Sequence, residues 1–304
     1  MNEHQWYPTD VPDQSGKTFV ITGANSGIGF EAARFLAGRG ARLVMAVQRP
    51  AAGEEAANRL RLDNSSLEVQ VEPCDLSDLS AVEDCAARIT DTVGRLDVLI
   101  NNAGVMAVPF ATTVDGHERQ LGTNHLGHFA LTGRLLPLLL ESEAARVVTV
   151  SSDAHRLGRI DPENLNGDRY RKWGAYGRSK LANLLFAYEL DRRARRAGAA
   201  LTSVACHPGY ASTNLQGRSA REQGKSDWFW KLGNRFAQTA AGGALPTVRA
   251  ATDPSIEGGT YYGPKPRQAG SAVQVRSSGR SHEIATAEHL WEVSEQLTGV
   301  RFRF

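Results

Sequence analysis

One pair of residues in this 304-residue sequence could do acid–base chemistry: Tyr176 is followed four positions later by Lys180. Residues four apart share one face of a helix. A free tyrosine has a pKa of about 10, too high for a base at neutral pH, but an ammonium about 4 Å away stabilises tyrosinate by about 4 kcal/mol in a half-wet site. The spacing therefore predicts a tyrosine whose pKa is lowered toward neutrality, with an exposed chance pair as the alternative.

A glycine-rich turn near the N-terminus is the second feature that could bind a ligand. Residues 19–21 predict a short buried strand, Gly23, Gly27 and Gly29 follow, and residues 30–39 carry a helical pattern. Glycines let a ligand approach the backbone, and a helix N-terminus offers free N–H groups to a phosphate. The spacing differs from the common dinucleotide fingerprint, so the strand–turn–helix context carries the prediction of a phosphate site. A tight connection without a ligand is the alternative.

The elements that must position these residues alternate between strands and helices. This alternation is typical of an α/β fold with a single Rossmann-type, doubly wound parallel sheet of about seven strands and helices on both faces. Ligands in such sheets bind beyond the carboxyl ends of the strands. We expect residues 1–16 to form an arm and residues 17–304 one domain. Further strands are expected at 42–47, 67–72, 98–100, 146–150, 201–205 and 261–262, and helices at 51–62, 79–93, 117–140, 175–197 and 283–297.

Composition excludes several classes of function. The net charge is +2, from 35 basic and 33 acidic residues, which gives no electrostatic case for nucleic-acid binding. The three cysteines form no C-x-x-C pair and suggest a reducing compartment. The sequence shows neither a long apolar run nor a signal-peptide pattern at its start. We therefore expect a cytoplasmic protein that has no membrane or nucleic-acid partner.

Three motifs, in order, resemble those of the short-chain dehydrogenase/reductase family over nearly the whole chain. They are the turn that spans residues 22–29, Asn-Asn-Ala-Gly at 101–104, and Tyr-x-x-x-Lys at 176–180. The short sequence segments at 124–129, 150–155 and 179–183 are similar to those of its retinol-dehydrogenase-like branch. The resemblance implies an NAD(P)(H)-dependent oxidoreductase that interconverts an alcohol and an aldehyde or ketone by hydride transfer.

The resemblance also implies catalytic roles. Tyr176 would exchange a proton with the substrate oxygen, and Lys180 would lower the pKa of Tyr176 and hold the nicotinamide ribose. Ser152 would hydrogen-bond the same substrate oxygen, with Ser151 as the alternative. Asn124 would hold a water in a proton relay to Lys180.

The cofactor residues that the resemblance implies follow the ends of several expected strands. Asp75 would accept a hydrogen bond from the adenine amino group, and the last three residues of the set would surround the nicotinamide. The set comprises Gly23, Asn25, Ser26, Gly27, Ile28, Gly29, Gln48, Arg49, Asp75, Leu76, Asn102, Ala103, Gly104, Tyr176, Lys180, Pro208, Gly209 and Thr213.

The end of the second strand predicts which nicotinamide cofactor is used. NAD enzymes usually place an acid there, which repels a 2′-phosphate, whereas this chain has Val47. The resembling branch places arginine where Gln48 stands, and Arg49 comes one step later. We therefore favour NADP(H), with Arg49 as the phosphate partner and NAD(H) as the alternative.

Two segments are expected on the substrate side. Residues 153–175 could wall the pocket or cover the surface, and residues 210–240 should form a lid. The aromatic cluster Trp228-Phe-Trp230 suggests an apolar lining, and hence an apolar small molecule, although it could instead pack on the body or on a partner chain.

Three further points concern metal binding, alternative functions and the oligomeric state. His125, His128 and His155 lack acidic or cysteine partners at ligand spacing, so no metal is expected. A catalytically silent regulator on the same fold, or a sugar epimerase of the related extended class, is the alternative function. Family members often pair through the two long helices expected at 117–140 and 175–197, so the resemblance allows a homodimer or homotetramer.

Overall fold

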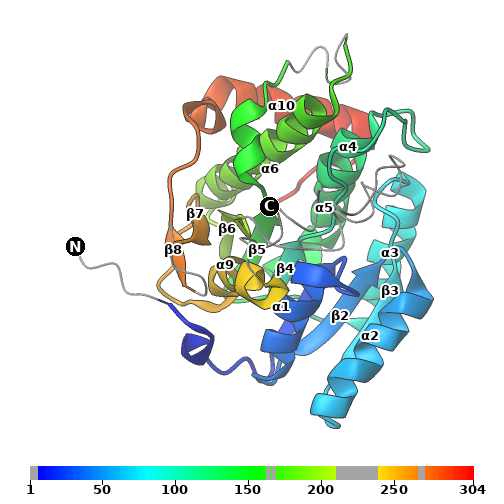
Figure 1. Ribbon diagram of the computed structural model, residues 1–304, viewed down its shortest axis with the longest axis vertical. Helices are drawn as coiled ribbons and strands as arrows, with labels where there is room; N and C mark the ends of the chain where they lie inside the picture. The colour runs from blue at the N-terminus through cyan, green and yellow to red at the C-terminus, as the bar shows by residue number, and fades with distance from the viewer. Residues whose placement is uncertain (1–5, 162–164, 166–168, 210–238, 266–270) are drawn as a thin grey trace, which may run out of the picture.

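The structure is a computed structural model that describes residues 6–161, 165, 169–209, 239–265 and 271–304. Its centre is an eight-stranded sheet in the order β3-β2-β1-β4-β5-β6-β7-β8, shown in Figure 1. The first seven strands are parallel, and β8 runs antiparallel to β7 at the edge. The strands are β1 (Thr18–Thr22), β2 (Arg42–Val47), β3 (Val69–Pro73), β4 (Val98–Asn101), β5 (Ala145–Val150), β6 (Leu201–Cys206), β7 (Tyr261–Pro264) and β8 (Ala272–Gln274).

The predicted Rossmann-type sheet is confirmed, and the eighth strand is an addition to it. All five residues of the central strand β1 are buried, because helices cover both faces of the sheet. Strand β8 has only three residues, too few to show the alternation by which a strand is recognised in a sequence.

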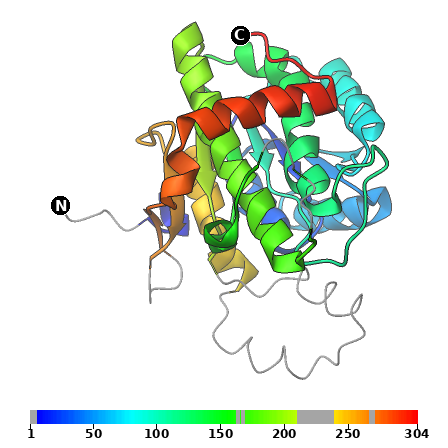
Figure 2. The same ribbon diagram turned by 90° about the horizontal axis from the view of Figure 1, so that it is seen from above.

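Helices form one layer on each face of the sheet (Figures 1 and 2). One layer contains α1 (Gly27–Ala37), α2 (Pro50–Asp63) and α9 (Ala240–Thr252). The other contains α3 (Leu79–Thr92), α5 (Gly127–Leu140) and α6 (Lys172–Ala197). Figure 2 shows α10 (Ile284–Thr298) lying across the outside of α6 and α5. Each face of the sheet therefore has its own hydrophobic core.

Helix α10 buries the leucine-rich stripe of the long helix α6. Leu181 and Leu185 pack against Leu290 of α10. Trp291 of α10 stacks on Phe186, with 5.7 Å between the ring centroids. These apolar side chains of α6 are thus covered within the chain itself.

The helix expected at 117–140 is interrupted. It consists of the short α4 (Arg119–Leu121), a π-helical stretch Gly122–Leu126, and α5. Two glycines bound this stretch at places of close packing: a Cβ at Gly122 would collide with Thr113, and a Cβ at Gly127 with the carbonyl of Leu76. A single π-turn inserts an extra residue into a helix and often marks a functional site. It contains Asn124.

The predicted N-terminal arm is attached to the domain. Trp6 is buried and forms a β-bridge with Ala272 of β8. Trp6 and Val11 share a small hydrophobic cluster with Leu245 and Val248 of α9. This part of the arm therefore covers the edge of the sheet near α9.

Candidate active site

The glycine turn forms a backbone cradle at the carboxyl end of β1. Gly23 and Gly27 have φ of +67° and +58°, a conformation that side chains disfavour. A Cβ at Gly29 would lie 2.5 Å from the carbonyl oxygen of Gly23. Ser26 is the N-cap of α1, yet its side chain makes no capping hydrogen bond, so the first N–H groups of the helix remain available. The cradle therefore fits a pyrophosphate.

Thr22 fastens the segment after β4 to this turn. Its Oγ1 accepts hydrogen bonds from the backbone N–H groups of Asn102 (2.9 Å) and Ala103 (3.0 Å). The Asn102 side chain donates to the carbonyl of Thr22 at 2.9 Å. Thr22 has no role in the sequence prediction, although its place between a strand and the glycine turn is the signal that could have indicated one.

Asn124 lies beside Lys180 across Gly104. A Cβ at Gly104 would be 2.8 Å from Asn124 Oδ1 and 3.6 Å from Lys180 Nζ. The Asn124 carboxamide is fully used: its oxygen accepts from the Val105 N–H, and its nitrogen donates to the Val105 carbonyl and to Ser179 Oγ. These contacts hold the side chain of Asn124 in one orientation.

The catalytic pair predicted from the sequence lies on α6 and is buried. The side chains of Tyr176 and Lys180 are 8% and 4% exposed. The Ser152 hydroxyl lies near enough to the Tyr176 phenol to lower its pKa, whereas the Ser151 hydroxyl donates to the carbonyl of Lys180 at 2.7 Å. Lys180 Nζ donates to the carbonyl of Val150 at 3.0 Å. The structure thus brings Ser152, rather than Ser151, to the tyrosine.

The direction of the Tyr176 pKa differs from the prediction. Burial raises the pKa of Tyr176 to about 12, and the Ser152 hydroxyl opposes this only in part. Burial also lowers the pKa of Lys180 to about 8. The Lys180 ammonium lies 5.9 Å from the centroid of the Tyr176 ring and donates a hydrogen bond to a backbone carbonyl. The desolvation of Tyr176 therefore outweighs the attraction between this ammonium and a tyrosinate.

The predicted adenosine end gathers at the carboxyl ends of β2 and β3. Gln48 donates to Asp75 Oδ2 at 3.0 Å, and Ser77 donates to Oδ1. Partial burial favours the protonated form, but these hydrogen bonds prevail and lower the pKa of Asp75. Arg49 is exposed beside them at the start of α2, and Val47 is buried in the core. Leu76, the remaining residue predicted here, is buried next to Asp75.

The predicted nicotinamide end follows β6. Gly209 has a φ of +66°, and its N–H donates to His207 Nδ1 at 3.1 Å, which turns the chain directly after the half-buried Pro208. The same nitrogen lies 3.6 Å from Asp153 Oδ2, next to Ser152. The third predicted residue, Thr213, and most of the expected lid, including residues 228–230, lie outside the described residues.

The end of the 153–175 segment lies next to the catalytic tyrosine. The Tyr170 hydroxyl donates to the carbonyl of Val108 and accepts from Gln120 Nε2, both at 2.8 Å. Trp173 is 44% exposed, and its ring meets the ring of Tyr176 edge-on, with 6.1 Å between centroids. Tyr170 and Trp173 thus pack against the segment after β4 and against Tyr176, and both alternatives for this segment stay predictions.

The described residues contain no group of three His, Cys, Asp or Glu side chains that could hold a metal ion. His125 and His128 instead make hydrogen bonds within the protein. None of the helices of the described part of the chain is both long and apolar enough to cross a bilayer.

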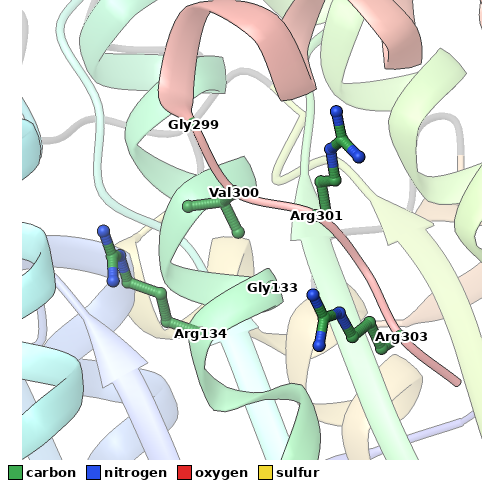
Figure 3. Close-up of a pocket in the computed structure, with 6 residues that line it drawn as sticks. All are labelled: Gly133, Arg134, Gly299, Val300, Arg301 and Arg303. Carbon is green, nitrogen blue, oxygen red and sulfur yellow. The ribbon is translucent and has the colours of Figure 1, made fainter.

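A surface cavity of about 330 Å³ lies away from this site, between α5 and the C-terminal residues. Figure 3 shows the guanidinium groups of Arg134, Arg301 and Arg303 pointing in different directions around it. Arg134 is paired with Glu83 at 2.7 Å. Since the three cations do not converge, we assign no ligand to this cavity.

Comparison with known proteins identifies the family. The family model for short-chain dehydrogenases matches residues 17–224. Human retinol dehydrogenase 12 is 41% identical over 290 residues, which cover 94% of this chain and 88% of the relative. Human retinol dehydrogenase 11 is 39% identical over 295 residues, covering 96% and 89%.

Solved structures share the fold of this chain. An uncharacterised protein from Mycobacterium paratuberculosis is 46% identical, matches 99% of this chain and 100% of its own, and superposes with a TM-score of 0.81. Levodione reductase shares the fold with a TM-score of 0.67 at 20% identity, covering 82% of this chain and 95% of its own. The chain therefore belongs to the short-chain dehydrogenase family, in its retinol-dehydrogenase-like branch, and is an NAD(P)(H)-dependent oxidoreductase that interconverts an alcohol and a carbonyl compound.

Proposed function

We propose that this enzyme is an NADP(H)-dependent oxidoreductase of apolar alcohols, aldehydes or ketones, in which Tyr176 moves the proton. The observation that carries the proposal is the cluster at the carboxyl end of β5: the half-buried Ser152 hydroxyl lies next to the buried Tyr176 phenol and lowers its pKa, and Lys180 Nζ lies 5.9 Å from the centroid of the Tyr176 ring. A hydroxyl pair of this kind can hold one substrate oxygen between two donors.

In carbonyl reduction the Tyr176 hydroxyl donates its proton to the substrate oxygen, and in alcohol oxidation it takes that proton back. Ser152 donates a second hydrogen bond and fixes where the oxygen lies. When bound, the nicotinamide cofactor supplies or accepts the hydride and, in its oxidised form, adds a positive charge that favours tyrosinate. Lys180 holds the ribose and, with a water held by Asn124, relays a proton from solvent to Tyr176 after carbonyl reduction and from Tyr176 to solvent after alcohol oxidation.

The preference for NADP(H) is supported by the end of β2. No acidic side chain stands at Val47, Gln48 or Arg49, so no carboxylate from these residues repels a 2′-phosphate. Gln48 is engaged by Asp75, whereas the guanidinium of Arg49 is exposed and makes no hydrogen bond or ion pair with the described residues. A free guanidinium suits a phosphate monoester because it can bind two oxygens at once.

An apolar substrate is supported by the exposed aromatic side chain next to Tyr176. Trp173 is 44% exposed, and its ring meets the ring of Tyr176 at 6.1 Å between centroids. Phe110, which is 60% exposed, packs on Tyr170 in the segment that precedes α6. Exposed apolar side chains beside a candidate site suit an apolar ligand. The names of the human relatives point to retinol, itself an apolar alcohol.

We also propose a cytoplasmic location and pairing of identical chains. The three cysteines are free and buried, as expected for a reducing compartment. Cell fractionation and the molar mass in solution test these two points. A membrane-bound fraction would contradict the location, and a strictly monomeric mass would contradict the pairing.

The test of function is NADPH consumption with a panel of apolar aldehydes and ketones, set against phosphorylated sugars. We expect turnover of apolar carbonyls and a higher kcat/KM with NADPH than with NADH. If the protein binds NADPH tightly but turns over no carbonyl compound or alcohol with either cofactor, the silent regulator becomes the better description. Preferential turnover of phosphorylated sugars would contradict the apolar substrate class.

A further inference from the structure

A continuous chain of hydrogen bonds runs from the cofactor turn to Asn124 through one buried histidine. His128, 1% exposed, has its Nδ1 2.9 Å from the main-chain carbonyl oxygen of Asn124. Its Nε2 lies 2.9 Å from Thr22 Oγ1. Thr22 Oγ1 in turn receives the N–H groups of Asn102 and Ala103.

The hydrogen-bonding partners determine which atom carries each proton in this series of hydrogen bonds. A carbonyl oxygen can only accept, so Nδ1 of His128 carries the hydrogen. Thr22 Oγ1 already accepts twice, and its own proton points to His128 Nε2 at 2.9 Å rather than to the carbonyl of Ile100 at 3.4 Å. The bonds therefore all run in one direction, from the amides after β4 to Asn124, and each polarises the next.

We propose that His128 is a positioning residue of the catalytic site, which ties the cofactor turn to the main-chain carbonyl of Asn124 through Thr22. This inference rests on the proposed role of Asn124 in the relay to Lys180. Asn124 lies in the π-helical stretch Gly122–Leu126, where the ordinary helical repeat is broken, and its side chain is anchored separately by Val105 and Ser179. His128 supplies the anchor for its backbone.

His128 is kept in this state by its surroundings. Burial, with a smaller contribution from the nearby charge of Lys180, lowers the pKa of His128 to about 4, although the hydrogen bond to Asn124 opposes this. The ring is therefore neutral at pH 7. A protonated ring would put a second donor against Thr22 Oγ1, whose proton already points at it, and would break the chain.

His125, which lies in the π-helical stretch that contains Asn124, provides a matched control for His128. It is equally buried, and its Nε2 lies 2.9 Å from Ser294 Oγ of α10. Ser294 donates to the carbonyl of Leu290, so Nε2 of His125 carries the hydrogen, and Nδ1 has no hydrogen-bond partner among the described residues. His125 thus has the opposite tautomer and connects Asn124's stretch to the C-terminal helix, away from the cofactor turn.

The first test reads the tautomers directly in the protein without cofactor. Nitrogen-15 NMR of labelled histidine, assigned with His125→Phe and His128→Phe, should show hydrogen on Nδ1 of His128 and on Nε2 of His125. Hydrogen on Nε2 of His128 would reverse the direction of the chain and overturn the inference.

The second test measures kcat, its pH profile and NADPH affinity in variants. His128→Phe removes both hydrogen bonds and should lower kcat by about 10²-fold, the cost of a small misplacement in an active site. It should also shift the apparent pKa of kcat. His128→Asn keeps a nitrogen donor near the Nδ1 position and should recover part of the loss. His125→Phe should lower thermal stability but leave kcat within about threefold.

Equal losses of kcat in the two phenylalanine variants would show general damage to the π-helical stretch and overturn the inference. So would a wild-type kcat and pH profile in His128→Phe. If that variant does not fold, His128→Asn decides: a wild-type kcat and pH profile refute the positioning role, and an intermediate kcat supports it. The Tyr176→Phe variant distinguishes failure of the proposed mechanism from failure of the His128 inference. An active Tyr176→Phe enzyme refutes the proposed mechanism. An inactive Tyr176→Phe enzyme together with an unaffected His128→Phe enzyme refutes only the role of His128.

Discussion

The two ends of the proposed active site use different parts of the protein. The proposed cofactor end consists mainly of backbone: three glycines, helix amides without a side-chain cap, and a threonine that fastens two loops together. The catalytic end consists of buried ionisable side chains, Tyr176 and Lys180, whose pKa values are displaced in opposite directions by burial. The first end depends on shape, which glycine spacing encodes directly. The second depends on the electrostatic environment, which only the folded structure supplies.

This difference predicts that substitutions at the two ends impair different steps of the enzyme's activity. Changes to the turn should weaken nucleotide binding and leave the chemical step of the bound complex nearly intact. Changes to Tyr176 should abolish the chemical step and leave nucleotide binding nearly intact, whereas changes to Lys180, which holds the ribose in the proposed mechanism, should impair both. Variants at each end, assayed for both nucleotide affinity and kcat, test whether the two effects are separate.

The largest effect is expected from Tyr176→Phe, which deletes one oxygen. The kcat should fall by about 10² to 10⁴, because acid–base help is lost while the ring still fills its site. Affinity for NADPH, measured by fluorescence titration, should be unchanged. Tyr188→Phe is the matched control, since Tyr188 lies on the same helix, is buried and bonds Ser277. A Tyr176→Phe enzyme that retains more than about a tenth of the wild-type kcat contradicts the mechanism.

A second effect should appear in stability at acid pH. The pKa of His128 in the folded protein is about 4, below its ordinary value of 6.5, so neutral His128 favours folding above pH 6.5. This contribution, on the order of 3 kcal/mol, is lost as pH falls from 6.5 toward 4. His125, with a pKa of about 3, extends the loss to lower pH.

Urea unfolding of the wild type and of His128→Phe between pH 7 and pH 4 isolates this contribution from that of the carboxylates. The variant cannot protonate at this position, so its disadvantage relative to the wild type should shrink as the pH falls. A difference in unfolding free energy that stays constant over this range contradicts the assignment of His128 as a buried neutral ring.

The third effect concerns the cofactor turn. Gly27→Ala should lower NADPH affinity by at least about tenfold, equivalent to about 1.4 kcal/mol, and leave the kcat at saturation nearly unchanged. Gly198→Ala is the control, because Gly198 has a φ of +69° close to that of Gly27 and open space around it, at the end of α6. Both variants carry similar backbone strain, so equal losses of affinity would refute the phosphate site.

The smallest effect is expected at the adenosine end. Arg49→Ala should reduce the ratio of kcat/KM for NADPH over NADH by about fivefold, because the contact is exposed and screened by salt. The kcat/KM for NADH serves as the internal control and should not fall. An unchanged ratio would remove Arg49 as the phosphate partner, and a wild-type preference for NADH would overturn the choice of NADP(H).

Much of the fold could be predicted because its signals are local. The seven parallel strands follow apolar runs, and the turn at Gly23–Gly29 lies where the sequence predicts it. Helix α9 escaped prediction because Gly242, Gly243 and Pro246 within it are typical of loops, although packing against α1 stabilises it. The π-helical stretch Gly122–Leu126 escaped prediction because its residues carry no local signal that separates a π-helix from the α-helix on either side of it.

The site shows the same division. The motif positions of Asn124, Ser152, Tyr176 and Lys180 come together as expected, because each motif fixes its own loop or helix. The pKa of Tyr176 was predicted in the wrong direction for the protein without cofactor, because residue spacing gives proximity but not desolvation. The link through His128 could not be predicted, since it joins β1, β4 and α5, which only the folded chain brings into contact.

Trp173 gives this enzyme an optical consequence. Its half-exposed indole meets the ring of Tyr176 edge-on, whereas Trp6 and Trp291 are buried far along the chain, in the arm and in α10. Trp228 and Trp230 lie outside the described residues, so a variant in which every tryptophan except Trp173 is replaced isolates its emission. In that variant, occupation of a site beside Tyr176 would shield the indole of Trp173 from dissolved quenchers. Trp173 can then serve as a built-in fluorescent probe, which follows ligand binding without any label.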